Sequence, residues 1–217
     1  MSARDDVFAN IRRSLHVTGA EAPRRAAVAD RLAKTPSGVI PGRGQGGLAT
    51  FKAEAERAAA TLSQIASAAE IPAEIARYLR EHNLPATLRV GADPRLAALP
   101  WDQTPLELAH GPSDGHDFNA ASVAFAGIAE TGTLMLPSAP ERPTTLNLLA
   151  DTEIAVLRAL RVVGAYEDAW DLLRSERGGM PRNVMLVTGP SRSADIEQAL
   201  ELGAHGPRRL HIVVVGG

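Results

Sequence analysis

NVMLVTGPSRSADIEQALEL, residues 183–202, places a short apolar run before a loop and a stretch with helical spacing. The run 183–188 has the length and composition of a strand. Ser193 suits the position just before a helix, and Ile196 and Leu200 follow on one helical face over residues 193–202. A strand, a loop and a helix in this order form the repeating unit of an α/β sheet.

The same alternation extends along the rest of the chain. Further runs with strand character occupy residues 86–90, 122–128, 133–136, 153–163 and 210–215. Helical spacing marks residues 166–174, and Pro72 suits the first turn of another helix that carries Ile75 and ends near Asn83. We therefore expect an α/β protein with an open, mostly parallel sheet flanked by helices.

The first 47 residues differ from the remainder. Val7, Phe8, Ile11 and Leu15 recur at helical spacing and predict a short amphipathic helix over residues 1–15. Residues 18–47 are rich in Gly, Pro, Ala and Arg without a period, as in a linker or mobile arm. The expected domains are a helix with a flexible arm over residues 1–47 and an α/β domain over residues 48–217.

The strongest helical pattern follows directly after this arm. Apolar residues recur at alternating steps of three and four between Leu48 and Ala69, with charged residues off the apolar seam. The pattern predicts one helix over this whole stretch.

Composition limits the chemistry open to the chain. No cysteine occurs among its 217 residues, which excludes disulfides, cysteine-ligated zinc and cysteine-bound iron–sulfur clusters within it. The net charge of −2 gives no electrostatic case for a nucleic-acid or anionic-membrane partner. The apolar runs fall short of the roughly 20 residues that a membrane span needs, and residues 2–6 do not resemble a secretory signal. We expect a cytoplasmic protein.

Two motifs are better explained by ordinary structure. Gly42, Gly44 and Gly47 match the spacing of a dinucleotide-binding loop, but no strand precedes them and no acidic residue follows at the required distance, which favours a flexible hinge. His110, Asp114, His116 and Asp117 are candidate metal ligands, yet nothing rigid aims them at one point. A solvated loop is the better interpretation, and no metal site is predicted.

Residues 127–133, GIAETGT, place a carboxylate and two hydroxyls between two apolar runs. Gly132 allows a ligand to approach the backbone closely, and Glu130 could act as a base, a nucleophile or a hydrogen-bond acceptor beside Thr131 and Thr133. A tight turn between two strands, with Glu130 in solvent, explains the pattern equally well. The residues alone leave both interpretations open.

A second group of candidates follows the run 183–188, because ligands of open α/β sheets bind outside strand carboxyl ends. The group comprises Gly189, Ser191, Arg192, Asp195, His205 and Gly206. Arg192 could hold a carboxylate or phosphate bidentately, although Asp195 and Glu197 already supply negative charge at the start of the expected helix. Turns and helix caps would explain the same residues without a ligand.

The sequence resembles the LUD-domain family in three segments that occur in the same order, 126–133 (AGIAETGT), 189–197 (GPSRSADIE) and 202–207 (LGAHGP). Ser193 and Ala204 depart from the Thr and Val usual there, and neither departure removes a group that would carry chemistry. The resemblance extends from the first helix to Val215. It implies a fold similar to the glucosamine-6-phosphate isomerase, ribose-5-phosphate isomerase and CoA-transferase group.

The resemblance also implies a role in a bacterial system that oxidises L-lactate to pyruvate together with iron–sulfur partner subunits. The missing cysteines fit that division of labour, since the redox centres would lie in the partners. The implied pocket places Glu130 and residues 131–133 opposite the second group of candidates, with a small carboxylate or phosphate as its ligand. The family supplies no established reaction for this subunit.

Three hypotheses follow. The preferred one is a subunit or accessory protein of L-lactate oxidation. The second is a stand-alone enzyme that uses Glu130 on a small phosphorylated or acyl-CoA substrate. The third is a non-catalytic adaptor whose N-terminal helix docks a partner.

Overall fold

The computed structural model describes residues 2–34, 38–194 and 200–216 of the chain. It contains two compact units, Met1–Val39 and Ile40–Gly217. The boundary therefore falls after residue 39, whereas the sequence pattern placed it after residue 47.

The described part of the first unit contains two helices, α1 (Ala3–Ser14) and α2 (Ala22–Lys34). A capping box starts α1, since the Asp5 N–H donates to the Ser2 hydroxyl and the Ser2 N–H donates to the Asp5 carboxylate. This confirms the helix expected near the start of the chain. The expectation of a linker is wrong for α2, because its alanines and arginines favour a helix even without a sustained apolar period.

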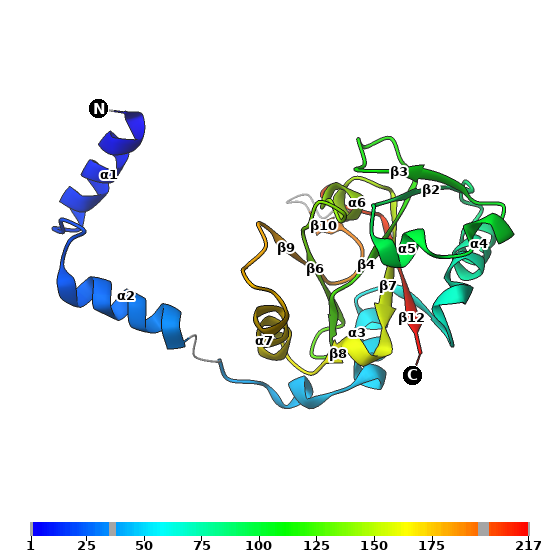
Figure 1. Ribbon diagram of the computed structural model, residues 1–217, viewed down its shortest axis with the longest axis horizontal. Helices are drawn as coiled ribbons and strands as arrows, with labels where there is room; N and C mark the ends of the chain where they lie inside the picture. Colours follow the sequence, from blue (N-terminus) through cyan, green and yellow to red (C-terminus); the bar gives the residue numbers. More distant parts are fainter. Residues whose placement is uncertain (1, 35–37, 195–199, 217) are drawn as a thin grey trace. The chain divides into compact units, whose positions relative to one another are not determined.

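The second unit is built around a six-stranded sheet in the order β1-β12-β7-β4-β2-β3. In chain order its strands are β1 (Thr61–Ile65), β2 (Thr87–Val90), β3 (Glu107–His110), β4 (Asn119–Val123), β7 (Thr152–Arg158) and β12 (Arg209–Val215). All five pairings are parallel. Figure 1 shows β12 and β7 side by side in the middle of this unit. The expected open, mostly parallel α/β sheet is confirmed.

Helices and a smaller sheet cover the two faces of the parallel sheet. One face packs against α4 (Ile71–Glu81) and the short α5 (Pro94–Ala97). The other packs against α3 (Leu48–Arg57) and a mixed sheet in the order β8-β5-β6-β9. The strands of this sheet are β5 (Ala126–Ile128), β6 (Thr133–Pro137), β8 (Val162–Val163) and β9 (Val184–Val187), and α7 (Tyr166–Glu176) packs on β5. Figure 1 shows α4 on one side of β12 and the mixed sheet on the other.

The shorter elements connect these layers. They are the helix α6 (Thr145–Leu148), the antiparallel pair β10 (Arg192–Ala194) and β11 (Leu200–Leu202), and four 3-10 turns, η1 (Gly42–Gln45), η2 (Ala68–Glu70), η3 (Trp101–Gln103) and η4 (Ala159–Arg161). The expected strand 153–163 is thus interrupted by η4, and the expected strand 122–128 divides into β4 and β5.

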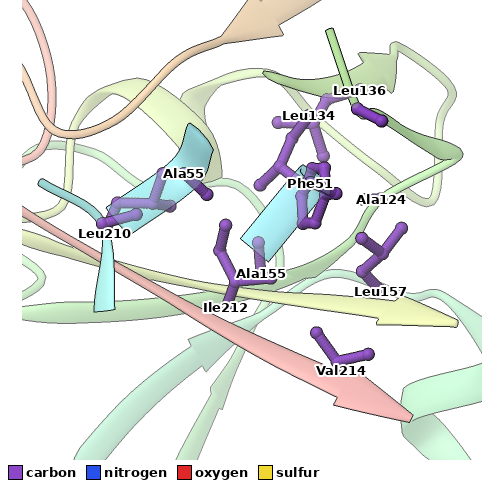
Figure 2. Close-up of a cluster of buried hydrophobic side chains, with 12 residues drawn as sticks. Phe51, Ala55, Ala124, Leu134, Leu136, Ala155, Leu157, Leu210, Ile212 and Val214 are labelled. Carbon is purple, nitrogen blue, oxygen red and sulfur yellow. The ribbon is translucent and has the colours of Figure 1, made fainter. Parts of the chain in front are cut away.

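The core follows the alternation of side chains along the strands. On β7, Ala155 and Leu157 face α3, and Ile154 and Val156 face α4. Phe51 is fully buried at the centre of the α3 side. Figure 2 shows its ring gathered with side chains of β6 and β7. The parallel sheet is therefore apolar on both faces, as a sheet covered on both sides must be.

The long helix expected over residues 48–69 is wrong beyond Arg57. The α3 helix ends there, Ala59 adopts a positive φ of 66°, and β1 begins at Thr61. Residues 61–65 pair with β12, which satisfies the backbone groups that a longer helix would have bonded internally. The apolar positions in this segment suited both structures, and pairing with a distant strand decided between them.

The helix expected over residues 193–202 is also wrong where the structure describes it. Residues 192–194 form β10 and residues 200–202 form β11, with Arg192 opposite Leu202 and Ala194 opposite Leu200. Ser193 lies within a strand and is not a helix cap. Residues 195–199, which include the candidate Asp195, lie outside the described residues.

Candidate functional site

The turn between β5 and β6 is fixed tightly against α3. Gly132 has a φ of 66°, and a Cβ added to it would lie 2.2 Å from the backbone nitrogen of Ala55. The Glu130 N–H donates to the Gly164 carbonyl at 2.9 Å, which ties the turn to the segment before α7. Glycine is therefore required at position 132 by packing, independently of any ligand.

Four hydroxyl groups form a continuous network next to this turn. The Thr131 and Thr133 oxygens lie 2.6 Å apart, and both lie within 2.9 Å of the Tyr166 hydroxyl. Thr133 also lies 2.6 Å from the Thr188 hydroxyl. Either oxygen of each pair can donate, so the network links the predicted motif at 130–133 to the segment leading into Gly189.

Sequence reasoning missed Tyr166 and Thr188. Tyr166 is the first residue of α7, and Thr188 directly follows β9. A hydroxyl at the end of an apolar strand, next to the Gly-Pro turn, was the available signal for Thr188. No comparable signal pointed to Tyr166, because it lies 33 residues beyond Thr133.

Glu130 is buried, with 9% of its surface exposed, so the interpretation as a solvated turn residue is wrong. A Cβ added to the buried Gly44 would lie 3.7 Å from Glu130 Oε2, and one added to Gly164 would lie 1.9 Å from the Gly44 carbonyl oxygen. Gly44 is therefore a packing residue over Glu130 and not part of a free hinge. Within the described ranges, no hydrogen-bond donor reaches the Glu130 carboxylate.

The second group of candidates is partly assembled. The Ser191 N–H donates to the Pro207 carbonyl at 2.8 Å, and the His205 N–H donates to the Ser191 hydroxyl at 3.2 Å. A Cβ on Gly206 would lie 3.5 Å from Ser191 Cβ. Gly189 has a φ of 74° and packs against the Ala58 carbonyl. Ser191, His205 and Gly206 thus lie together, whereas Gly189 serves packing at the end of α3.

Arg192 lines a cavity of about 210 Å³. Arg208, Arg209, His82 and Tyr78 also line it, so three arginine residues contribute to its wall. No acidic side chain of the described residues lines the cavity, and the Asp151 carboxylate lies 3.6 Å from Arg208 Nε. Charge and size suit a small anion.

This cavity lies at the opposite end of the sheet from the expected position. Thr61 and Arg209, which line it, are the first residues of the parallel strands β1 and β12, so it opens at their amino ends. The strand that precedes Arg192 is β9, which is antiparallel to β6 in the mixed sheet. The expectation of a site at a parallel strand's carboxyl end is therefore wrong for Arg192.

Beside this cavity, a buried histidine is held in its neutral form. The His211 ring stacks on Tyr78 with centroids 4.0 Å apart, and its two nitrogens lie 2.9 Å from the Thr61 hydroxyl and 3.1 Å from the Ser63 hydroxyl. Burial lowers the pKa of His211 to about 4, although the Glu74 carboxylate opposes that shift. At neutral pH the ring is uncharged and holds Tyr78 in place.

Glu153 on β7 is a buried carboxyl group that sequence reasoning passed over. Its Oε1 accepts hydrogen bonds from the Asn147 amide at 2.5 Å and the Ser122 hydroxyl at 3.2 Å. Its Oε2 has no hydrogen-bond partner among the described residues. Burial raises the pKa of Glu153 to about 7 against these two hydrogen bonds. The signal that could have revealed this buried carboxyl group was a glutamate within an otherwise apolar strand.

The candidate metal ligands do not converge. Asp117 pairs with Arg89 at 2.9 Å, and the His116 N–H donates to Asp114. Across residues 2–34, 38–194 and 200–216, no three His, Asp or Glu side chains gather as a metal site. In the same ranges, no helix is long and apolar enough to cross a membrane.

Comparison with known proteins identifies the family. The LUD domain profile matches residues 120–215, which include both predicted motif groups. A Deinococcus radiodurans protein named lactate utilization protein C is 35% identical over 160 residues, which cover 69% of this chain and 71% of that protein. The chain belongs to the LUD domain family.

Other relatives match over shorter segments. An uncharacterized protein of Neisseria meningitidis is 43% identical over 94 residues, 43% of this chain and 40% of that protein. Lactate utilization protein C of Geobacillus kaustophilus is 33% identical over 126 residues, 54% of this chain and 52% of that protein. The LUD domain chain therefore aligns with about half or less of the length of these two relatives.

The fold is shared with a solved structure. A DUF162 family protein from Deinococcus radiodurans superposes with a TM-score of 0.61 and 24% identity, covering 78% of this chain and 96% of that one. This likeness supports the three-layer α/β architecture of the LUD domain chain.

Proposed function

We propose that the protein is a component of a bacterial L-lactate utilization system and works with iron–sulfur partner subunits in the oxidation of L-lactate to pyruvate. The observation that carries the proposal is the 35% identity with lactate utilization protein C of Deinococcus radiodurans over 71% of that protein. The chain holds no cysteine, so cysteine-bound clusters would have to belong to its partners.

The site that we assign to this role is the cavity beside Arg192, with a small carboxylate as its ligand. A guanidinium group can hold a carboxylate through two parallel hydrogen bonds, and Arg208 and Arg209 add positive charge to the same 210 Å³ space. Ser191, His205 and Gly206 shape the adjoining loop. Asp195 remains a candidate ligand residue on sequence grounds alone.

In the same proposal, the buried motif at 130–133 is connected to the segment that leads to Arg192 through the hydroxyl network. Thr133 contacts Thr188, and Thr188 leads directly into Gly189 and the Arg192 loop. Glu130, Thr131 and Gly132 complete this motif, with Glu130 as its acid or base.

Growth on L-lactate as sole carbon source tests the role. A deletion strain lacking other lactate dehydrogenases should fail to grow, and the wild-type gene should restore growth. Arg192→Gln should restore it poorly, whereas Arg174→Gln, a matched change in an exposed pair with Asp171, should restore it fully. Normal growth of the deletion strain would refute the lactate role, and full rescue by Arg192→Gln would refute the Arg192 site.

A second candidate function is that of a stand-alone acyltransferase, which the burial of Glu130 favours over a purely structural turn. In that reaction the Glu130 carboxylate would attack an acyl-CoA carbonyl, form a mixed anhydride and release CoA as its thiolate. Incubation with acyl-CoA donors followed by peptide mass spectrometry should then detect the acyl group on Glu130. Unmodified Glu130 across a donor panel, with Glu130→Gln as the blank, would refute this function.

A third candidate is an adaptor role for the first unit. Val7 and Ile11 on α1 are 56% and 46% exposed, so the apolar stripe of this helix lacks a partner among the described residues. We propose that this N-terminal part, expected from sequence over residues 1–47, binds the partner subunits. Deleting residues 2–39 should abolish their co-purification, while Arg31→Gln, on the exposed α2, should not; survival of the complex after deletion would refute the role.

A further inference from the structure

A second and larger cavity, of about 710 Å³, lies outside the carboxyl ends of four neighbouring strands. Val215 ends β12, Val123 ends β4, Val156 and Arg158 lie at the end of β7, and Ala66 directly follows β1. These four strands are consecutive in the sheet. The carboxyl edge of an open parallel sheet is where this class of fold binds its ligands.

This cavity is separate from the one beside Arg192. The two share no lining residue, and β12 runs from one to the other, because Arg209 starts the strand at the first cavity and Val215 ends it at the second. At about 3.3 Å per residue, a strand of seven residues places the two cavities roughly 20 Å apart. A ligand at one cannot touch the other.

The walls of the larger cavity are mostly apolar. Its floor is made by Val123, Val156 and Val215 of the sheet, and Ile71 and Leu96 close its sides. A volume of this size and an apolar lining with few polar groups are typical of sites for small organic molecules. Lactate has too small an apolar part to cover such a surface.

The charged groups that line the cavity are both positive. They are Arg95 and Arg158, and no acidic side chain of the described residues lines it. No ion pair of Arg158 is found in the described part of the chain, so its guanidinium is available to an anion. The exposed Leu160, at 88%, also lines this cavity and extends its apolar surface to the solvent.

Arg95 is held rigidly for such a role. Its Nε and Nη2 donate to the two Asp93 oxygens at 2.9 and 2.6 Å, which leaves Nη1 without a partner among the described residues. Asp93 is buried and caps α5 by accepting from the Arg95 N–H at 3.0 Å. Although burial opposes ionisation, the Arg95 hydrogen bonds hold the pKa of Asp93 below its ordinary value, so the pair stays charged. A guanidinium fixed before binding loses little entropy when an anion arrives.

We infer that this cavity binds an organic anion with an apolar body. The anionic head contacts Arg95 Nη1 and the Arg158 guanidinium, and the apolar body lies on the valines of the sheet floor. The inference does not depend on the lactate role, because it concerns the other end of the sheet and other residues.

Calorimetry and tryptophan fluorescence on the full chain test this inference with three probes. Decanoate has both a carboxylate and an apolar chain, decyltrimethylammonium has the same chain with the opposite charge, and L-lactate has a carboxylate without the chain. Decanoate should bind at this cavity with one-to-one stoichiometry, and the other two should bind there at least tenfold more weakly. L-lactate binding that leaves the Trp101 emission unchanged belongs to the smaller cavity. In a Trp170→Phe background, decanoate should change the emission of Trp101, whose indole donates to the carbonyl of the lining residue Leu96 at 2.7 Å.

Two exposed substitutions locate the binding without disturbing the core. Arg158→Gln should weaken decanoate binding by about tenfold, and Leu160→Glu should weaken it comparably by placing a negative charge beside the head group. Arg192→Gln, in the other cavity, and Arg174→Gln on α7 should leave it unchanged. Circular dichroism verifies that each variant is folded.

The results that overturn the inference are distinct from failure of the lactate role. They are absence of decanoate binding, equal binding of decyltrimethylammonium, or wild-type affinity in both Arg158→Gln and Leu160→Glu. Loss of decanoate binding in Arg192→Gln would assign the anion to the smaller cavity instead. The growth assay on L-lactate tests only the proposed function. Its result does not depend on whether the cavity beside Arg158 binds decanoate.

Discussion

Replacing Glu153 with glutamine should change the free energy of unfolding differently at two pH values. At pH 8 this change should be about 3 kcal/mol more favourable to the folded protein than at pH 4.5. The ordinary pKa of the side chain is 4.5, and burial raises it to about 7 in the folded state. The two values differ by about 2.5, and each pKa unit corresponds to about 1.4 kcal/mol. The sign follows from where the proton resides in each state.

Below pH 4.5 both the folded and the unfolded protein carry the Glu153 proton, and the group does not change stability with pH. Above pH 4.5 the unfolded chain releases the proton while the folded protein keeps it to about pH 7. The unfolded state then binds fewer protons, so this group lowers wild-type stability as pH rises through that window. Glutamine cannot ionise and avoids this loss.

Glutamine also preserves much of the local structure. Its carbonyl oxygen can accept from Asn147 and Ser122 as Glu153 Oε1 does, and its amide takes the place of Oε2, which has no partner in the described structure. Any cost of burying that amide is independent of pH and drops out when the two pH values are compared.

Urea unfolding of wild type and Glu153→Gln at pH 4.5, 6 and 8, followed by circular dichroism, measures the effect. Glu107→Gln is the matched control, since it removes a carboxylate from an exposed strand position and should change stability by less than about 0.5 kcal/mol throughout. A stability difference between Glu153→Gln and wild type that stays constant across these pH values would refute the reasoning.

The other predictions concern stability. His211→Gln should destabilise the protein most at pH 7, and urea unfolding should show that this loss of stability is about 2 kcal/mol smaller at pH 4.5. Below pH 6.5 the unfolded wild type binds a proton on His211, whereas the folded wild type binds it only near pH 4. The wild type therefore loses stability over this range, and the variant does not. Gly132→Ala should lower the free energy of unfolding by more than about 2 kcal/mol, because its Cβ would lie 2.2 Å from the α3 backbone. Gly178→Ala is the control, since open space surrounds that position, and it should change the free energy of unfolding by less than about 1 kcal/mol. Equal shifts in the thermal unfolding midpoints of the two variants would contradict this prediction. Phe51→Ala should cost about 3–5 kcal/mol in denaturant unfolding and Phe118→Ala, which is exposed, less than about 1 kcal/mol, and similar costs would disprove the assigned core.

Alternation of apolar runs and helical stretches was sufficient to predict the fold class. The strands expected at 86–90, 133–136, 183–188 and 210–215 correspond to β2, β6, β9 and β12, and the helices near residues 71–83 and 166–174 correspond to α4 and α7. These segments carry their own signals, because length, spacing and flanking turn residues are all local in sequence.

The wrong assignments arose where partners far away in sequence decide the structure. Residues 61–65 are a strand because β12 lies beside them, and nothing local distinguishes them from a continuation of α3. The turn at Ala59 takes a positive φ without the glycine that usually announces one. Ser193 and its acidic neighbours predicted the start of a helix. In the structure Ser193 lies in β10, which pairs with β11.

The candidate site was predictable in its residue types and less so in its position. The grouping of Ser191 with His205 and Gly206 follows from the order of the motifs, and the structure brings these residues together. The prediction that Arg192 lies at the carboxyl edge of the sheet was wrong, because sequence alone does not reveal which strands belong to the parallel sheet. The Arg95 and Arg158 cavity was missed, since it is built from four strand ends without a shared motif.

The position of β1 constrains how the protein is made. Among the strands that the structure describes, β1 pairs only with β12, and about 150 residues separate the partners Thr61 and His211 along the chain. At a synthesis rate of about 5–20 residues per second, β1 is made roughly 8–30 seconds before its partner strand. Contacts of such long range also slow folding, because a large loop must close before any pairing is gained. Until β12 has been synthesised, the nascent chain therefore carries β1 with its backbone hydrogen-bonding edge unpaired by that strand.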